Sequence, residues 1–322
     1  MSKKLALGID LGGTGIKLGL VDVTGKLIRT FRFGTPSKKD PAEVVGLIVE
    51  QADALIHTVG KRAIIGIGIG AAGDVEPGTG IIRISPNLQW KDVPLKALLS
   101  RSLKYSIRVE NDANVAAWAA YVVEAKKKVR NLLCVTLGTG VGGGIITDGR
   151  LYRGSSGSAG EIGHMTLYPE GIPCPCGNVG CLERYIGARA MSEEARRAIE
   201  AGETTLITRL VNNDLSKIEP LILQDAAQKG DRLALQLYEQ AGERLGITMA
   251  GVVNFFNPEW IVLAGGLSRA GKLLLDPLSR TISKRSFSTA AKTARLVISK
   301  LNQDLGIVGA GLVAHEYDKN ES

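Results

Sequence analysis

The side chains best suited to chemistry include three cysteines in one short loop. Cys174, Cys176 and Cys181 are separated only by proline, glycine, asparagine and valine residues, so the chain turns repeatedly there. Thiolates are preferred zinc ligands, and in a reducing compartment clustered cysteines indicate a metal site before disulfides. Reduced cysteines without a metal are the alternative interpretation. Cys134 lies in an apolar segment and is predicted to be a small buried side chain.

A tetrahedral zinc site needs a fourth ligand, for which His164 is the candidate. The other two histidines, His57 and His315, lie in segments that are predicted to be helical and surface-like. A zinc ion held by four protein side chains is structural, not catalytic. We therefore expect the ion to fix the loop that carries Glu161 and Glu183 together with His164.

Asp112 lies where a predicted strand, 106–110, gives way to a predicted helix, 113–127. An aspartate at the start of a helix is a common N-cap, which is the simpler interpretation. The same position favours the ionised carboxylate, because the N-terminal end of a helix carries partial positive charge. An ionised carboxylate can accept a proton from a substrate hydroxyl, so Asp112 is the candidate general base.

Two glycine-rich turns, 12–15 and 138–140, each follow one apolar segment and lead into another. Backbone N–H groups in such turns can surround a phosphate, and Thr14 and Thr139 add hydroxyl donors. Neither turn is a P-loop or a dinucleotide fingerprint, since both of those need a helix after the turn. A plain β-hairpin is the alternative for either turn alone. Two such turns at matching places in the two halves of the chain indicate that each binds a phosphate of the same nucleotide, from opposite sides.

Asp10 ends the first apolar segment and is predicted to face the phosphates, holding Mg²⁺ directly or through water. A turn-initiating aspartate is the alternative. A third glycine turn, after the apolar segment 261–264, is expected to flank the adenosine. The residues predicted to bind ATP are Asp10, Gly12, Gly13, Thr14, Lys17, Gly138, Thr139, Gly140, Gly265 and Gly266.

Hydrophobic patterns predict the elements that must position these residues. Strands are predicted over 5–10, 16–21, 26–33, 63–69, 106–110, 131–137 and 142–146, and helices over 41–59, over 113–127 and from about 305 onward. Because the hairpin pattern occurs twice, we expect two halves built on one plan with a cleft between them. The predicted lobes are 1–113, joined by the C-terminal helix 305–322, and 114–304, which carries the zinc loop.

Composition narrows the class of protein. A chain of 322 residues with 44% hydrophobic and 22% charged residues is ordinary for a soluble protein of two packed lobes. The formal net charge is +8, but the basic residues are scattered apart from Lys126–Lys128, which we interpret as a solvated helix end. No apolar run reaches membrane-spanning length, and no signal region follows Met1. We expect a cytoplasmic protein with no nucleic-acid or membrane partner.

Together these motifs resemble those of the ROK family, named for repressors, open reading frames and kinases. Segment 10–14 looks like the family's first phosphate motif, 137–144 looks like the second, and 110–114 is similar to the segment with the catalytic aspartate. Segment 161–164 is similar to the Glu-x-Gly-His sugar motif. Segment 174–183 matches the zinc-loop signature at every fixed position. The resemblance covers residues 5–314.

The resemblance implies an α/β, two-lobed actin-like ATPase (ribonuclease H-like) fold with Mg-ATP and sugar in the cleft. It implies phosphorylation of a hexose, with glucose to glucose 6-phosphate as the expected reaction, and commonly a dimer or tetramer. It also implies that His164 binds zinc through one ring nitrogen and sugar through the other. The residues it places against the sugar are Asn87, Asn111, Asp112, Glu161, His164 and Glu183.

Two segments depart from the family's pattern. Ala71-Ala72-Gly73 stands where many members carry Pro-Gly, so the lip of the sugar site is expected to differ. Gly15 follows Thr14 where a lysine is more frequent, which leaves polyphosphate as an alternative donor. Mannose, fructose, allose and N-acetylmannosamine are alternative substrates.

Two other functional classes compete with a kinase. The family's sugar-responsive repressors carry a helix-turn-helix before the sugar lobe, and only Met1 to Lys4 precede the first predicted strand, so we expect no room for one. A non-catalytic sugar sensor is the other class. Intact phosphate turns and an intact Asp112 favour the kinase.

Overall fold

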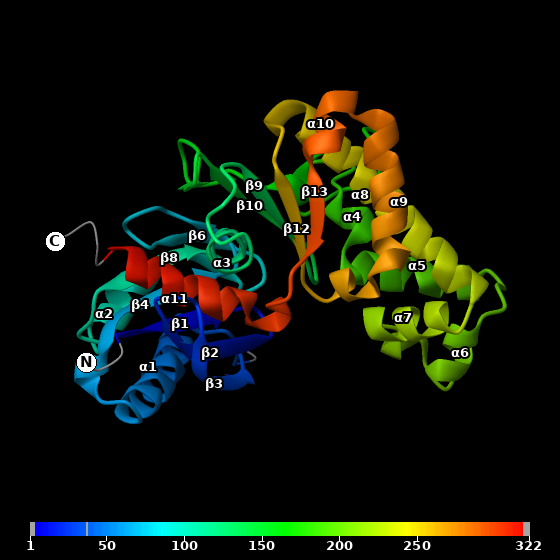
Figure 1. Ribbon diagram of the computed structural model, residues 1–322. Helices are drawn as coiled ribbons and strands as arrows, with labels where there is room; N and C mark the ends of the chain where they lie inside the picture. Colours follow the sequence, from blue (N-terminus) through cyan, green and yellow to red (C-terminus); the bar gives the residue numbers. More distant parts are fainter. Residues whose placement is uncertain (1–3, 37, 318–322) are drawn as a thin grey trace. The chain divides into compact units, whose positions relative to one another are not determined.

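The computed structural model describes residues 4–36 and 38–317 (Figure 1). The chain divides into two compact units. The first contains residues 1–134, 144–160 and 303–322, and the second contains 135–143 and 161–302. Strands β9 (Leu132–Leu137) and β10 (Val141–Thr147) carry residues of both units.

A five-stranded sheet in the order β3-β2-β1-β4-β8 forms the centre of the first unit. Its strands are β1 (Leu5–Leu11), β2 (Gly15–Asp22), β3 (Leu27–Gly34), β4 (Ile64–Ala71) and β8 (Ile107–Asn111). Strand β1 pairs antiparallel with β2 and parallel with β4, and β4 pairs parallel with β8. Strands β1 and β4 read as nearly continuous apolar runs because both of their faces are buried.

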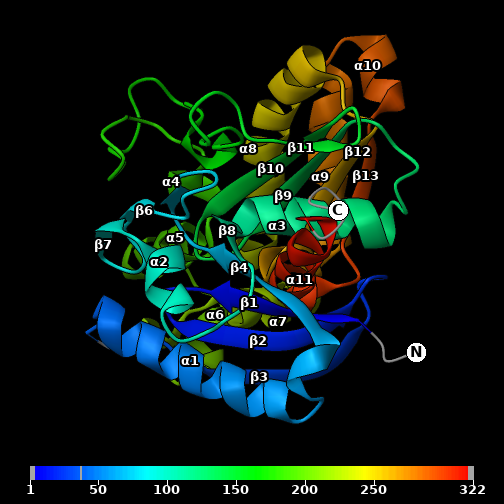
Figure 2. The same ribbon diagram turned by 90° about the vertical axis from the view of Figure 1, so that its left-hand side faces the viewer.

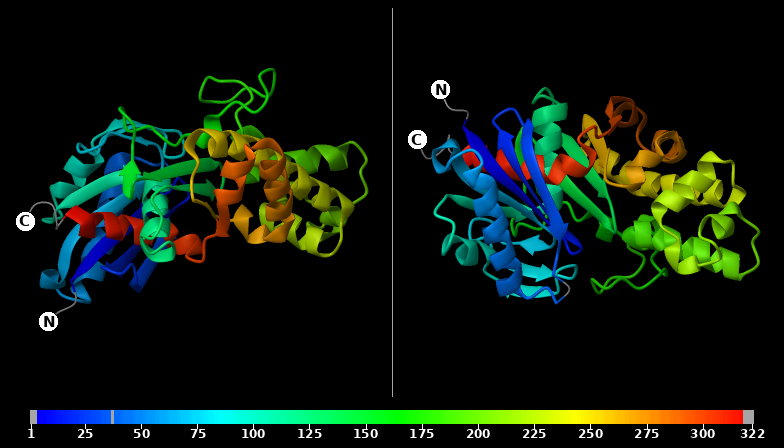
Figure 3. Two further views of the ribbon diagram at one scale, coloured as in Figure 1. Left: turned by 45° about the horizontal axis from the view of Figure 1, so that its top comes forward. Right: turned by 90° about the horizontal axis from the view of Figure 1, so that it is seen from below.

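Helices cover the two faces of this sheet. Alternate residues of β1, such as Leu7 and Ile9, enter the core with Val44 and Ile48 of α1 (Pro41–His57). Helix α1 starts at Asp40, whose side chain accepts hydrogen bonds from the first free backbone N–H groups. The opposite face is covered by α11 (Leu305–Tyr317), and Figure 3 shows the two helices on either side of the strands.

Helix α11 packs so closely on the sheet that its backbone touches the strands, which leaves no room for side chains at some strand positions. A Cβ atom at Gly8 would lie 2.1 Å from the carbonyl oxygen of Ile307, and one at Gly68 would lie 1.8 Å from that of Ala310. Likewise a Cβ at Gly309 would lie 1.8 Å from the carbonyl oxygen of Val115. The C-terminal helix is therefore wedged between the sheet and α3 (Asp112–Ala119).

We expect Gly68→Ala to lower the free energy of unfolding by about 3 kcal/mol, because the backbone of α11 must move to admit a methyl group. Gly46→Ala is the matched control. Gly46 lies on the exposed side of α1 with no neighbour within 4 Å, so the same change should raise stability by about 0.5–1 kcal/mol. Urea unfolding of both variants checks the prediction, and equal midpoints would contradict the packing described here.

The rest of the first unit surrounds the sheet (Figure 2). A small antiparallel sheet contains β5 (Asp74–Val75), β6 (Ile82–Ser85) and β7 (Trp90–Val93). It is followed by α2 (Leu95–Ser100). After β8 the chain enters α3, which ends in a π-helical turn, Ala120–Glu124. Strand β11 (Arg150–Tyr152) pairs with β10.

The second unit contains two parallel strands, β12 (Trp260–Ala264) and β13 (Arg295–Ile298), in a sheet of order β11-β10-β9-β12-β13. Long helices α8 (Arg232–Phe256) and α9 (Lys272–Arg285) pack closely, with Gly242 against Pro277. Its other helices are α4 (Glu183–Ile186), α5 (Ala188–Glu200), α6 (Leu206–Leu210), α7 (Pro220–Gln228) and α10 (Ser288–Thr293). The short 3-10 turns of the chain are Lys61–Ala63, Ile162–His164, Leu215–Lys217, Leu267–Ala270 and Asn302–Asp304.

Within the residues that it describes, the structure confirms the predicted strands and helices, including both hairpins. Residues 318–322 of the predicted C-terminal helix 305–322 lie outside the described residues. The predicted helix 113–127 is α-helical only to Ala119. The predicted boundary after residue 113 also differs from the observed division, since α3 packs on α11 and β4 and stays in the first unit. Among the described residues, no helix is both long enough and apolar enough to cross a membrane.

Candidate functional site

The first glycine turn is a tight β-hairpin between β1 and β2. Its ends are joined by a hydrogen bond from the N–H of Gly12 to the carbonyl of Gly15, 3.0 Å. Gly13 lies directly against Asn87, because a Cβ at position 13 would be 2.5 Å from the Asn87 carbonyl oxygen. The structure therefore brings a predicted phosphate-binding glycine next to a predicted sugar-binding asparagine within the first unit.

Asp10 lies next to one lysine and to the start of a helix. The Nζ of Lys17 donates to its Oδ2 at 2.9 Å. Gly306, at the start of α11, lies so close that a Cβ there would be 2.8 Å from Asp10 Cγ. The Asp10 carboxylate therefore lies against the Lys17 ammonium and the first turn of α11, whose N-terminus carries partial positive charge. The sequence predicted Asp10 and Lys17 for this site but not Gly306.

The strand-to-helix junction with Asp112 is held by its neighbours. Asn111 is the N-cap of α3, since its Oδ1 accepts from the N–H groups of Ala113 (2.9 Å) and Asn114 (3.1 Å). Asp112 is the first residue of the helix, and its Oδ1 lies 2.9 Å from the N–H of Ala113. The capping role that competes with catalysis for Asp112 is thus carried by Asn111.

The second glycine turn belongs to the second unit and is contacted by Glu183. The Oε2 of Glu183 accepts a hydrogen bond from the N–H of Val141 at 2.8 Å. A Cβ at Gly140 would lie 2.0 Å from the same oxygen, so a larger residue there would displace the Glu183 carboxylate. Glu183 was predicted to face the sugar, and the structure also makes it a support of the turn.

The third glycine turn adjoins the second. Gly265 has a φ of +94°, and a Cβ there would lie 2.4 Å from the carbonyl oxygen of Leu137, which immediately precedes Gly138. The Oγ of Ser268 donates to the Gly265 carbonyl at 2.7 Å and closes the turn. Gly265 and Gly138 therefore meet at the ends of neighbouring strands β12 and β9.

The predicted zinc ligands lie together in the second unit. One ligand atom from each of His164, Cys174, Cys176 and Cys181 falls within 4.8 Å of all the others. The Sγ atoms of Cys176 and Cys181 are 3.7 Å apart, and Cys174 Sγ lies 3.7 Å from Nδ1 of His164. Tetrahedral geometry with Zn–S bonds of about 2.3 Å requires sulfur atoms about 3.8 Å apart. These four side chains fit a zinc ion.

The loop that presents these side chains is fixed by its backbone. The N–H of Cys174 donates to the Asn178 carbonyl at 2.8 Å. Gly180 has a φ of +75°, and a Cβ there would lie 1.6 Å from the carbonyl oxygen of Tyr168. On the far side of the His164 ring, Nε2 lies 4.0 Å from a carboxylate oxygen of Glu161. The imidazole thus presents Nδ1 to the cysteines and Nε2 to Glu161.

The thiols differ in how readily they ionise. A backbone N–H of Asn178 lowers the pKa of Cys176. Burial raises the pKa of Cys181 to about 12, so this thiol ionises near neutral pH only when a nearby positive charge compensates. A divalent cation held by the cluster would supply that charge.

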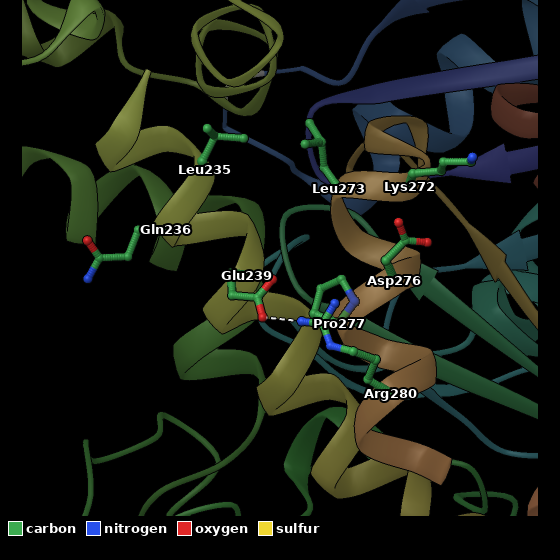
Figure 4. Close-up of a pocket in the computed structure, with 8 residues that line it drawn as sticks. All are labelled: Leu235, Gln236, Glu239, Lys272, Leu273, Asp276, Pro277 and Arg280. Carbon is green, nitrogen blue, oxygen red and sulfur yellow. Dashed lines mark hydrogen bonds and ion pairs between the residues drawn. The ribbon is translucent and has the colours of Figure 1, made fainter. Parts of the chain in front are cut away.

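A surface depression lies elsewhere in the second unit, between α8 and α9 (Figure 4). Its volume is about 430 Å³, and Glu239 and Arg280 form an ion pair across it. It contains Lys272 and Asp276 as well, so its charges balance, and it includes no residue that the motifs predict. We assign it no ligand.

The predicted site residues therefore form two groups, one on each unit. On the first unit are Asp10, Gly12, Gly13, Thr14, Lys17, Asn87, Asn111 and Asp112, and on the second are Gly138, Thr139, Gly140, Glu161, His164, Glu183, Gly265, Gly266 and the three clustered cysteines. Two sheets thus each carry a glycine-turn hairpin, and the second unit also carries the loop with His164 and the three cysteines.

The chain belongs to the ROK family, whose model matches residues 6–317. It is 34% identical over 326 residues to a glucokinase of Halalkalibacterium halodurans, covering 99% of this chain and 98% of that protein. It is 30% identical over 305 residues to a xylose repressor of Caldicellulosiruptor bescii, covering 94% of this chain and 76% of the repressor.

Comparison with solved structures also points to the ROK family. The crystal structure of a ROK family glucokinase from Streptomyces griseus, in complex with glucose and AMPPNP, is 32% identical. It superimposes with a TM-score of 0.88 over 97% of this chain and 99% of that one. The chain therefore has the actin-like α/β fold of the ROK kinases, as the sequence predicted.

Proposed function

We propose that this protein is an ATP-dependent hexose kinase whose preferred reaction converts glucose to glucose 6-phosphate. The observation that carries this proposal is the end-to-end similarity to glucokinases, 34% identical over 98–99% of each chain, in a sequence that retains both glycine turns and Asp112. Formation of ADP that depends on both glucose and the protein, with glucose 6-phosphate as product, tests it. ADP release without sugar phosphate would contradict it.

In the proposed mechanism the first unit supplies the base. Asp112 accepts the proton of the 6-hydroxyl as that oxygen attacks the γ-phosphorus of ATP, and ADP leaves. Asn111 caps α3 with its side-chain oxygen, and its Nδ2 donates a hydrogen bond to the Gly73 carbonyl at 3.0 Å. This contact fixes the orientation of the amide next to the base. Asn87, which adjoins the first glycine turn, completes the first unit's contacts with the sugar.

The second unit supplies the remaining sugar ligands in this proposal. Glu161 and the Nε2 of His164 bind ring hydroxyls, and Glu183 binds a hydroxyl with the carboxylate that also holds the second glycine turn. Paired carboxylate and amide groups discriminate between hexoses, because a missing or inverted hydroxyl leaves a buried polar group without a partner. Glucose is proposed over other hexoses on the strength of the glucokinase relatives.

The phosphates are proposed to lie against the two glycine turns. Their backbone N–H groups and the hydroxyls of Thr14 and Thr139 donate to phosphate oxygens, and Asp10 faces the metal that accompanies the nucleotide. Asp10 would help to hold Mg²⁺ with the nucleotide, and the ion would offset the negative charge of the phosphates during transfer. Gly265 and Gly266, beside the second turn, are proposed to flank the adenosine.

Thr14→Val and Thr139→Val should each raise the KM for ATP about ten- to 150-fold, the effect of one lost hydrogen bond to a charged group. The KM for glucose should stay within about twofold, since neither threonine is proposed to touch the sugar. Steady-state kinetics with one substrate varied at a time checks both values. A larger change in the glucose KM than in the ATP KM would place the nucleotide elsewhere.

We also propose that His164, Cys174, Cys176 and Cys181 hold one structural Zn²⁺. The distances among these four side chains fit tetrahedral coordination of zinc and support the proposal. Three thiolates and one imidazole fill all four positions of such a site, so none is left open. The ion would fix the loop between Glu161 and Glu183. It has no part in phosphoryl transfer.

Sugar-responsive repression is the second candidate function, because xylose repressors also match this chain. The chain spans about three quarters of the length of these repressors. Repression predicts sugar binding without turnover and sugar-dependent DNA binding. The kinase assay above separates the two functions, since a repressor without catalysis produces no ADP.

A further inference from the structure

The residue before the sugar-binding asparagine, Glu110, is a buried carboxylate that the mechanism does not use. It is only 7% exposed at the end of β8. Its Oε1 accepts from the N–H of Asn111 at 3.1 Å and from Nδ2 of Asn114 at 2.9 Å. Asn114 is itself 1% exposed in the first turn of α3. One oxygen of Glu110 therefore ties the strand end to the helix start on both sides of Asp112.

The other oxygen of Glu110 is bound by Arg153. Its Oε2 accepts from Nε of Arg153 at 2.6 Å, a short charge-assisted hydrogen bond. Arg153 is the residue after β11 and lies 43 positions after Glu110 in the sequence. Here it begins the segment 153–159, which ends just before Gly160 and Glu161.

The segment 153–159 is fixed to the same part of the first unit at further points. The Oγ of Ser158 donates to Asp74 at 2.9 Å, and Arg83 donates to the carbonyl of Ser156 at 2.9 Å. Asp74 adjoins Gly73, whose carbonyl receives the Asn111 amide. The segment 153–159 is therefore bonded at one end to Glu110 and near its other end to Asp74, next to the residue that binds Asn111. Both ends of the segment thus lead back to the junction of β8 and α3.

The Glu110 side chain is 9% exposed and that of Arg153 is 33% exposed, so the pair is partly buried. Such an ion pair stabilises a fold only weakly, because desolvation of the charges offsets their attraction. This pair lies beside the residues that need the tightest placement. A displacement of the reacting groups by about 1 Å can lower turnover about a hundredfold. We propose that Glu110 and Arg153 are positioning residues for Asp112, which hold the β8–α3 junction in the geometry that phosphoryl transfer requires. This inference rests on the proposed kinase function.

The test is the kinetics of Arg153→Met, which removes the charge and keeps much of the aliphatic stem. We expect kcat with glucose to fall about ten- to a hundredfold and the KM for ATP to stay within about twofold. Arg130→Met is the matched control, since Arg130 pairs with Asp148 at an exposed site of the same unit. The control should keep wild-type kcat. Arg153→Lys should recover part of the activity.

A structural role alone is separated from a positioning role by a double variant. If Arg153 acts through Asp112, then Arg153→Met should lower kcat less than about threefold in an Asp112→Asn background. An undiminished loss in that background, or normal kcat in Arg153→Met, would overturn the inference and leave the kinase proposal intact. A wild-type protein with no kinase activity would overturn both.

If Arg153→Met does not fold, Glu110→Gln takes its place. The glutamine keeps an acceptor for Asn111 and Asn114 but loses the acceptor for Arg153. The same kcat loss and the same dependence on Asp112 are expected. Normal kcat in this variant would equally overturn the inference.

Discussion

Asp112→Asn is expected to lower kcat by about two to four orders of magnitude, the usual contribution of a positioned general base. Asparagine keeps the size and much of the hydrogen bonding of aspartate but cannot accept the proton of the sugar hydroxyl. The Kd values for glucose and ATP should stay within a few-fold of wild type. Steady-state kinetics and calorimetric titration of both ligands measure these quantities.

The competing roles of Asp112 give different results. If Asp112 mainly binds the sugar, its replacement by asparagine should raise the KM for glucose with little change in kcat. A helix cap would tolerate asparagine, and the structure already assigns the cap to Asn111. Asp148→Asn is the matched control at an exposed left-handed position with φ +49°, where asparagine is readily accommodated. Near-normal kcat in Asp112→Asn would defeat the general-base assignment.

Cys176→Ser is expected to lose the zinc, part of the stability and most of the activity together. We expect about one zinc per chain in the wild-type protein and less than about a tenth of that in the variant, because serine is a poor ligand where a thiolate is required. Release of the loop between Glu161 and Glu183 should lower Tm by about 5–10 °C.

Metal analysis by mass spectrometry, thermal unfolding and the kinase assay measure these three effects. Cys134→Ala is the matched control, since Cys134 is buried in β9 and distant in sequence from the cluster. It should retain zinc and most of the activity. A wild-type protein that contains no zinc after purification without chelators would contradict the metal site.

Local patterns in the sequence predicted much of the site. Glycine turns between apolar segments fix a hairpin by themselves, and the cysteine spacing brings its own ligands together, because these signals lie within about ten residues. The end of the helix after Asp112 was less predictable. The pattern continues to Lys127, whereas the structure changes to a π-helical turn at Ala120.

Contacts between distant segments were not predictable from one sequence. Nothing in the local sequence links Glu110 to Arg153, or Asp10 to Gly306, because folding alone brings those segments together. The same holds for the contact of Glu183 with Val141, which gives a predicted sugar ligand a second role at the glycine turn. The division of the chain after residue 134 instead of 113 follows from the packing of α3 on α11.

The central claim is ATP-dependent phosphorylation of a hexose. Its most direct test is kcat/KM over a panel of glucose, mannose, fructose, allose and N-acetylmannosamine, with ATP and with polyphosphate as donors. We predict that glucose with ATP gives the highest value, with glucose 6-phosphate as product. Sugar binding without phosphoryl transfer to any member of the panel, from either donor, would contradict the account.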